Sequence, residues 1–205
     1  MPLLSGIGFG YLQVMNVPEA DALVFESSND LADWLAEYHA DRGELWVRIY
    51  KAGSQQRSVT WNDCVIEAIR FGWIDGLKRP GDERSYLQRL TPRRAGSSWS
   101  TKNREHADRL IAEGLMTPAG LAHVEAARTD GRWDAAYEGS ATMVIPQDFL
   151  DALATLPEAE AFFRTLDRKN LYPIYHRLQT AKHLETRARR MQKILEQLSR
   201  GERFH

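Results

Sequence analysis

The chain has few of the residues that build several common kinds of functional site. Its one cysteine, Cys64, excludes an internal disulfide and a zinc site made of cysteines, and it is predicted to be a buried, inert thiol. No run approaches the roughly 18 apolar residues needed to cross a bilayer. There is no Gly-x-Ser-x-Gly elbow and no Walker loop, and the six histidines show no paired metal-ligand spacing. The sequence therefore predicts neither a metal nor a cofactor, and it gives hydrolase and nucleotide-triphosphatase chemistry no motif support.

Basic residues are missing from the first part of the chain. Residues 1–41 carry seven acids and no Lys or Arg, although the whole chain has a net charge of only −1. A secretory signal needs a positive n-region and a small-residue cleavage site, and neither is present here, so we expect a cytoplasmic protein. We also expect residues 1–20 to be a poorly ordered N-terminal extension. Residues 21–205 are then predicted to form a single domain.

The order of the patterns predicts an α+β fold. Residues 44–50 alternate between apolar and polar, and residues 73–79 and 84–90 form two further strands across a Pro-Gly-Asp turn at residues 80–82. A strand at 23–26 and helices at 28–38 and 60–71 accompany them. We expect a small antiparallel sheet packed against helices in residues 21–100, followed by a mostly helical part in residues 101–205.

The last predicted helix, residues 181–200, has the clearest periodicity. Its apolar residues recur at spacings of four, three, four and three, as an amphipathic helix requires: Leu184, Ala188, Met191, Leu195 and Leu198. Arg187 and Arg190 differ from the other basic residues of this helix, because Arg187 falls at the edge of the apolar stripe. An arginine there either extends its head to solvent or faces an anionic group.

The stretch from Phe71 to Asn103 is the predicted functional region. Residues 76–104 contain eight Lys/Arg against two acids, a local balance of +6. Charged, aromatic, hydroxyl and glycine residues mixed this densely make a poor core and a plausible site. The candidate ligand-binding residues are Trp73, Asp75, Arg93, Arg94, Ser98, Trp99, Ser100 and Asn103, with Arg187 and Arg190 as distant contributors.

Each candidate also has a structural interpretation. Asp75, between a Trp-Ile pair and a glycine, is either a desolvated acid/base or a carboxylate paired inside the hairpin. Arg93 and Arg94 either bind an anion such as phosphate, carboxylate or nucleic acid, or are ordinary surface charges. The hydroxyls at residues 98–101 precede a helix and either bind an anion at its N-terminus or simply cap it. Trp99 either stacks on a ligand or belongs to the core.

Several blocks of the sequence resemble one known family. In order, they are Phe-Gly-Trp-Ile-Asp-Gly at 71–76, Thr-Pro-Arg-Arg at 91–94, Ser98-Trp-Ser100 with Asn103, Gly114 with Met116 and Gly120, Asp-Gly-Arg-Trp-Asp at 130–134, and Ala181-Lys182 with Thr186-Arg187 and Arg190. Together, over about residues 23–200, they resemble the YdeI/OmpD-associated family, also labelled bacteriocin-protection proteins. The resemblance implies a small bacterial protein connected with protection against bacteriocins or cationic peptides and with an envelope porin. It brings no settled reaction and no catalytic residue.

Three functions are compatible with these features. The leading hypothesis is a non-enzymatic stress or protection protein that binds an anionic ligand or a protein partner through a basic–aromatic groove. The first alternative is a small enzyme with Asp75 as the acid/base and arginines that hold a phosphate or carboxylate. The second alternative is nucleic-acid binding through the basic stretch, with an affinity that falls steeply with salt.

Overall fold

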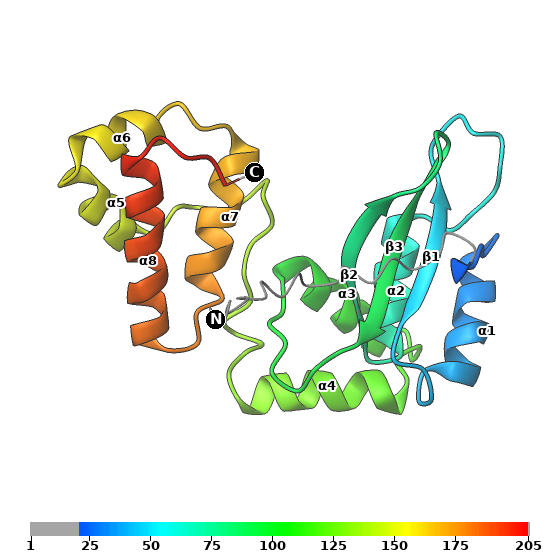
Figure 1. The fold of residues 1–205 in the computed structure, drawn as a ribbon. Helices are drawn as coiled ribbons and strands as arrows, with labels where there is room; N and C mark the ends of the chain where they lie inside the picture. The colour runs from blue at the N-terminus through cyan, green and yellow to red at the C-terminus, as the bar shows by residue number, and fades with distance from the viewer. Residues whose placement is uncertain (1–20, 205) are drawn as a thin grey trace, which may run out of the picture.

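The protein consists of a three-stranded antiparallel sheet and a series of helices (Figure 1). The computed structural model describes residues 21–204. The elements are α1 (Ser28–Tyr38), β1 (Leu45–Tyr50), α2 (Trp61–Arg70), β2 (Trp73–Pro80), β3 (Ser85–Pro92), α3 (Thr101–Ala112), α4 (Pro118–Thr129), α5 (Gln147–Ala154), α6 (Pro157–Phe163), α7 (Arg168–Gln179) and α8 (Leu184–Ser199). The strand order is β1-β3-β2, with β3 antiparallel to both neighbours. The prediction of an α+β fold is confirmed.

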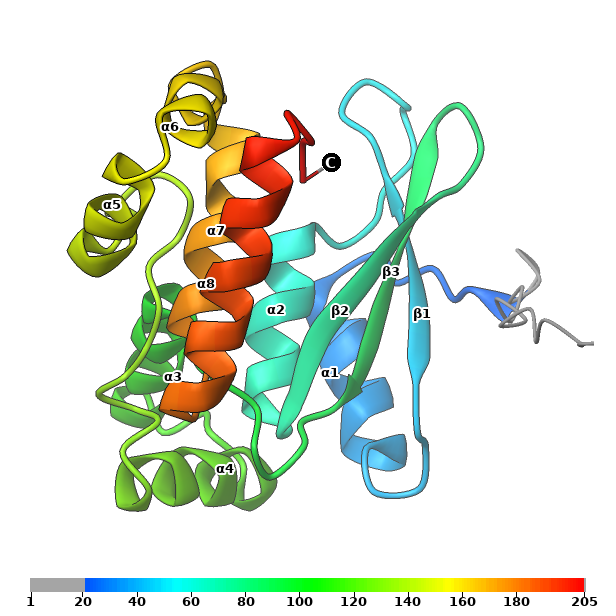
Figure 2. The same cartoon turned by 60° about the vertical axis from the view of Figure 1, so that its left-hand side comes forward.

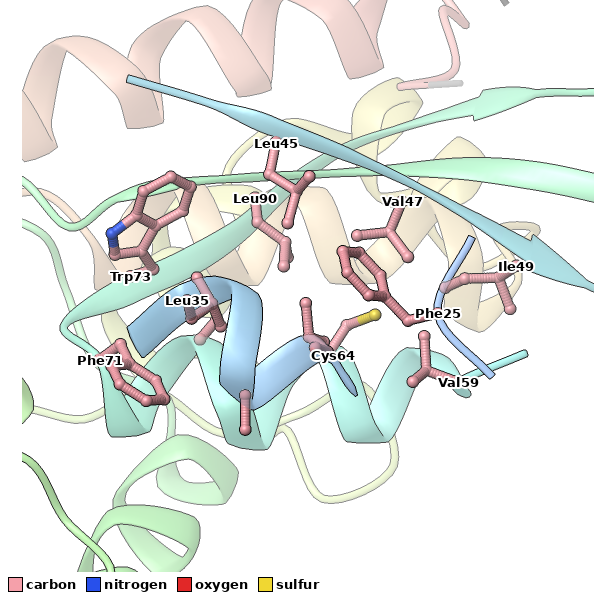
Figure 3. Close-up of a cluster of buried hydrophobic side chains, with 13 residues drawn as sticks. Phe25, Leu35, Leu45, Val47, Ile49, Val59, Cys64, Phe71, Trp73 and Leu90 are labelled. Atoms are coloured by element: carbon pink, nitrogen blue, oxygen red, sulfur yellow. The ribbon is translucent and has the colours of Figure 1, made fainter. Parts of the chain in front are cut away.

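One face of the sheet packs against α1 and α2 (Figure 3). The alternating residues Leu45, Val47 and Ile49 of β1 are buried on this face, as the period of two in the sequence predicts. Both helices begin with a capping box, from Ser27 in α1 and from Thr60 in α2. Burial of this face and satisfied helix N-termini together fix the two helices on the sheet.

Helix α2 also supports the helices that follow the sheet. Val65 and Ile69, on the face turned away from the sheet, pack with residues of α3 and α4 and with Trp99 and Trp133. The contact with α4 is close at Gly120, where an added Cβ would lie 2.4 Å from the carbonyl oxygen of Arg70. The loop that carries Trp99 is therefore anchored on the same helix that supports the sheet.

Helices α5 to α8 form a separate cluster at the other side of the molecule, with α7 and α8 side by side (Figures 1 and 2). Their core contains Phe149, Ile174, Leu195 and Leu198, all buried. A long segment after α4, residues 130–146, connects this cluster to the sheet-containing part.

Two local predictions differ from the structure, and a third concerns residues outside its described part. The predicted strand at 23–26 is reduced to a single parallel bridge between Leu23 and Val47. Leu184 and Ala188, expected in the apolar stripe of the last helix, are exposed, Leu184 by 87%, because α8 packs on the cluster core through its second half, where Ile194 is buried instead. Residues 1–20 lie outside the described part of the chain, so the prediction of a poorly ordered extension is not tested. Within residues 21–204, no helix has both the length and the apolar character required to span a membrane.

Candidate anion-binding site

Three cationic side chains converge on the loop between β3 and α3. Lys182 donates to the carbonyl oxygen of Gly96 at 2.6 Å, Arg132 to that of Ser97 at 2.8 Å, and Arg93 to that of Ser98 at 3.1 Å. The three donors come from the start of the loop, from the segment after α4, and from the segment between α7 and α8. Consecutive carbonyl dipoles thus hold three positive charges close to one short loop.

Arg93 has the most unusual environment of the three. Its side chain is only 4% exposed, and the guanidinium carbon lies 3.8 Å from the centroid of the Trp99 ring, a cation–π arrangement. Its Nη2 is buried and has no hydrogen-bond partner among residues 21–204. Burial lowers the pKa of Arg93 to about 10, while Tyr137 and Asp75 partly oppose this effect. The guanidinium is therefore still charged at neutral pH, yet one of its nitrogens is uncompensated.

A pocket opens beside these cations. We call it the loop pocket; it has a volume of about 390 Å³ and is lined by residues that include Ser98, Arg132, Ala135, Gln179, Thr180 and Lys182. Arg93 is not part of this lining and contacts it through its bond to the carbonyl of Ser98. Arg132 also forms an ion pair with Asp130 at 2.7 Å, which together with the charge of Lys182 lowers the pKa of Asp130. His123 lies nearby, and burial followed by the charges of Arg93 and Arg132 lowers its pKa. The surroundings of the loop pocket are thus dominated by positive charge.

Asp75 lies on the edge strand β2 and accepts a hydrogen bond from the indole N–H of Trp61 at 3.1 Å. Burial raises the pKa of Asp75, and the Trp61 bond and the charge of Arg93 only partly offset this. Tyr137 is electrostatically coupled to both Asp75 and Arg93, and its ring stands edge-on to His176 at 4.7 Å. The carboxyl is therefore a half-buried group between the sheet edge and the start of α2, close enough to Arg93 to influence its titration.

The remaining candidates near the loop have mainly structural partners. Trp73 is 1% exposed, lies in the core and donates its indole N–H to the carbonyl of His39. Ser100 caps α3 by accepting from the backbone N–H of Asn103, so this helix N-terminus is satisfied by its own cap. Arg94 is exposed.

The two arginines of α8 do not join this site. Arg187 forms a bidentate ion pair with Asp148, inside the C-terminal helix cluster. Arg190 lies on a different pocket between α7 and α8, where it donates to the carbonyl of Arg177 at 2.7 Å. The sequence-predicted site is therefore divided: Arg93, Ser98 and Trp99 come together, Asp75 lies at the sheet edge with an electrostatic link to Arg93, and Arg187 and Arg190 lie elsewhere.

Sequence reasoning missed Arg132, Lys182 and Tyr137 as contributors to the site. Arg132 and Lys182 both stand in blocks that carry the family resemblance, Asp-Gly-Arg-Trp-Asp at 130–134 and Ala181-Lys182. In the first of these blocks, Trp133 is buried against Trp99, with ring centroids 5.0 Å apart. Nothing in the sequence indicated that the basic residues beside these positions meet at one loop.

Comparison with known proteins gives two partial matches. Residues 142–201 match the model of the family described as bacteriocin-protection, YdeI or OmpD-associated, which confirms the resemblance for this part of the chain. Residues 23–123 match a domain of unknown function, DUF8412, and this segment includes Asp75, Arg93 and Trp99. No curated protein and no solved structure matches the chain. Among the residues the structure describes, no three or more His, Cys, Asp or Glu side chains gather in an arrangement for a metal ion.

Proposed function

We propose that this chain, whose residues 142–201 match the bacteriocin-protection family model, is a non-enzymatic protection protein that binds an anionic group in the loop pocket. The group is a phosphate or carboxylate of a small ligand or of a protein partner. Of the lining residues, Lys182 belongs to the family-matched segment and Ser98 to the other matched segment. The site thus draws residues from both matched parts of the chain.

The two cations on the lining of the loop pocket, Arg132 and Lys182, are the observation that carries this proposal, and the buried Arg93 bonded to the lining residue Ser98 supports it. A guanidinium out of water is stable when its donors and its charge are matched, and here one nitrogen has no partner within residues 21–204. An anion bound beside Ser98 would bring a negative charge close to this guanidinium. Arginine also favours planar, two-point binding to carboxylate and phosphate, and the Trp99 ring holds the fork in one plane.

The charge of the pocket supports the same ligand class. Lys182 has further N–H donors beyond the one that contacts Gly96, and it forms no ion pair within residues 21–204. Arg132 has Asp130 as its counter-ion, so the charged residues of the lining, Arg132, Lys182 and Asp130, leave a net charge of +1. An incoming anion would meet donors that are already positioned by backbone carbonyls, which reduces the entropy that binding has to overcome.

The test is a titration of the protein with inorganic phosphate, followed by calorimetry. Replacing Arg93 by Gln removes a buried positive charge next to the pocket, so we expect binding to weaken by about tenfold. Arg94→Gln is the matched control, because it removes the same charge from the next, exposed residue. It should leave the affinity unchanged.

Cell survival in the presence of a bacteriocin gives the biological measurement. A strain that lacks the protein is complemented with the wild type, Arg93→Gln or Arg94→Gln, and we expect only Arg93→Gln to lose protection. If Arg93→Gln kept both phosphate binding and protection, the loop pocket would not be the functional site. Circular dichroism of each variant shows that the fold is intact.

The second candidate function is acid/base catalysis by Asp75. Its raised pKa is the observation in favour, since a general base works best when its pKa lies near the working pH. Arg93 would then hold the phosphate or carboxylate of a substrate. This role first requires that Asp75 titrates above its usual range.

A further inference from the structure

A second basic pocket lies between α7 and α8, outside the proposed site. We call it the helix pocket; it has a volume of about 700 Å³. It is lined by residues that include Arg177 of α7, Arg190, Lys193 and Ile194 of α8, and the residues that directly follow the two helices, Thr180 and Arg200. Thr180 also lines the loop pocket, but Arg93, Arg132 and Lys182 do not line the helix pocket. The helix pocket falls within the segment that matches the bacteriocin-protection family.

The helix pocket carries an excess of positive charge. Residues 190, 193, 197 and 200 follow the three- and four-residue spacing that places side chains on one face of a helix, and three of them are basic. Arg177, Arg190 and Lys193 form no ion pair with a carboxylate within residues 21–204, while Arg200 pairs with Glu202. Glu196 is the acidic residue of the lining.

The central cation of this pocket is held in a fixed orientation. Arg190 uses Nη1 for two hydrogen bonds, to the carbonyl of Arg177 at 2.7 Å and to the hydroxyl of Thr180 at 3.2 Å. Its other N–H groups make no hydrogen bond to any residue in the described range 21–204. Ile194, 1% exposed, forms an apolar contact surface beside it. The charge of Arg190 also adds to the effect of burial in lowering the pKa of the neighbouring His176.

We propose that the helix pocket binds a soluble oligophosphate, a compact ligand with several linked phosphoryl groups. A single carboxylate would neutralise only one of the three basic side chains that form no ion pair here, whereas linked phosphates present several charges in a volume that the pocket can hold. The fork of Arg190 matches the geometry of a phosphate, and Lys193 supplies a point contact about one turn further along the helix. The net charge of −1 and the limited size of the pocket favour a compact ligand over a nucleic-acid duplex.

The proposal is tested by calorimetric titration of the full chain with tripolyphosphate at physiological salt. We expect Arg190→Gln and Lys193→Gln each to weaken binding by about tenfold, as the loss of one charge-assisted contact requires. Arg189→Gln is the matched control, since Arg189 is the exposed neighbour outside the pocket and makes no hydrogen bond or ion pair within residues 21–204. It should bind within about twofold of the wild type.

Arg190→Gln also removes the bonds to Arg177 and Thr180, so its effect combines a lost charge with lost local structure. Lys193→Gln leaves these bonds in place and is therefore the decisive variant. Arg93→Gln should retain tripolyphosphate binding, which separates this site from the loop pocket. Three results would overturn the proposal: no binding by the wild type, equal weakening by Arg189→Gln, or citrate binding as tight as tripolyphosphate. Affinity for single-stranded DNA that rises with its length would overturn it in favour of a nucleic-acid surface.

Discussion

Arg93 and Asp75 show how burial shifts the pKa values of two neighbouring groups of opposite charge in opposite directions. Burial lowers the pKa of Arg93 and raises that of Asp75, and in each case the other group partly reverses the shift. They form no ion pair within the described residues 21–204, so each is stabilised by dipoles instead. The carbonyl oxygen of Ser98 accepts a hydrogen bond from Arg93, and the indole N–H of Trp61 donates one to Asp75.

The titration of Asp75 has a measurable effect on stability. Because its pKa is higher in the folded than in the unfolded protein, the stability it contributes is fully present below the usual aspartate pKa of about 3.9 and is lost as pH rises through the folded-state value. Asp75→Asn keeps an acceptor for Trp61 without the charge, so it should raise the melting temperature at pH 7 and lose this advantage towards pH 4.

Thermal unfolding of the wild type and Asp75→Asn across this pH range is the measurement. Asp134→Asn is a suitable control, because that aspartate is exposed. Equal melting temperatures of Asp75→Asn and wild type at every pH would show that Asp75 titrates normally, and the acid/base role would then lose its support.

At the scale of single residues, the sequence predicted which residue types make up the site better than it predicted which residues contact one another. The excess of basic residues at 76–104 indicated an anion site, and Arg93, Ser98 and Trp99 do meet there. Lys182 is 86 positions from Gly96 in the chain, and its contact depends on how the helix cluster packs. Local patterns carry no information on such a contact, whereas they do predict caps and alternation within an element.

At the scale of elements, the close contact of α4 with α2 fixes the base on which the loop is anchored. An added Cβ at Gly120 would lie 2.5 Å from the Sδ of Met116 and 2.7 Å from the carbonyl oxygen of Ile69, in addition to the contact with Arg70. Backbone oxygens cannot move as freely as a side-chain end, so α4 would have to shift.

Gly120→Ala should therefore destabilise the protein by about 1–3 kcal/mol, the usual cost of overpacking. Denaturant unfolding measures this change. Gly139→Ala is the matched control, since an added Cβ there would meet nothing within 4 Å. If both variants were equally stable, α4 would not be closely packed on α2.

The elements themselves were mostly predictable because their signals are local. The Pro-Gly-Asp turn separates β2 from β3 as expected, and Gly72, Gly114 and Gly131 end helices with positive φ angles. The exposure of Leu184 was not predictable, because helical periodicity gives the face of a residue and not where the neighbouring helix ends.

At the scale of the whole molecule, Lys182 is a direct link between the helix cluster and the loop of the sheet-containing part. Its bond to Gly96 joins the segment before α8 to the segment before α3 (Figure 1). Arg168 makes a similar link within the C-terminal half, to the carbonyls of Ser140 and Ala141. The position of the loop therefore depends on a side chain from the distant part of the chain.

Lys182→Gln should loosen this loop without unfolding the protein. Loss of a charged hydrogen bond of about 1.5 kcal/mol corresponds to about tenfold faster amide exchange of residues 95–98. Hydrogen exchange with mass spectrometry measures it, and the exchange of β3 should stay unchanged. Lys193→Gln removes the same charge from α8 at a position away from the loop, so faster loop exchange in that variant as well would mean that net charge, rather than the Lys182 contact, holds the loop in place.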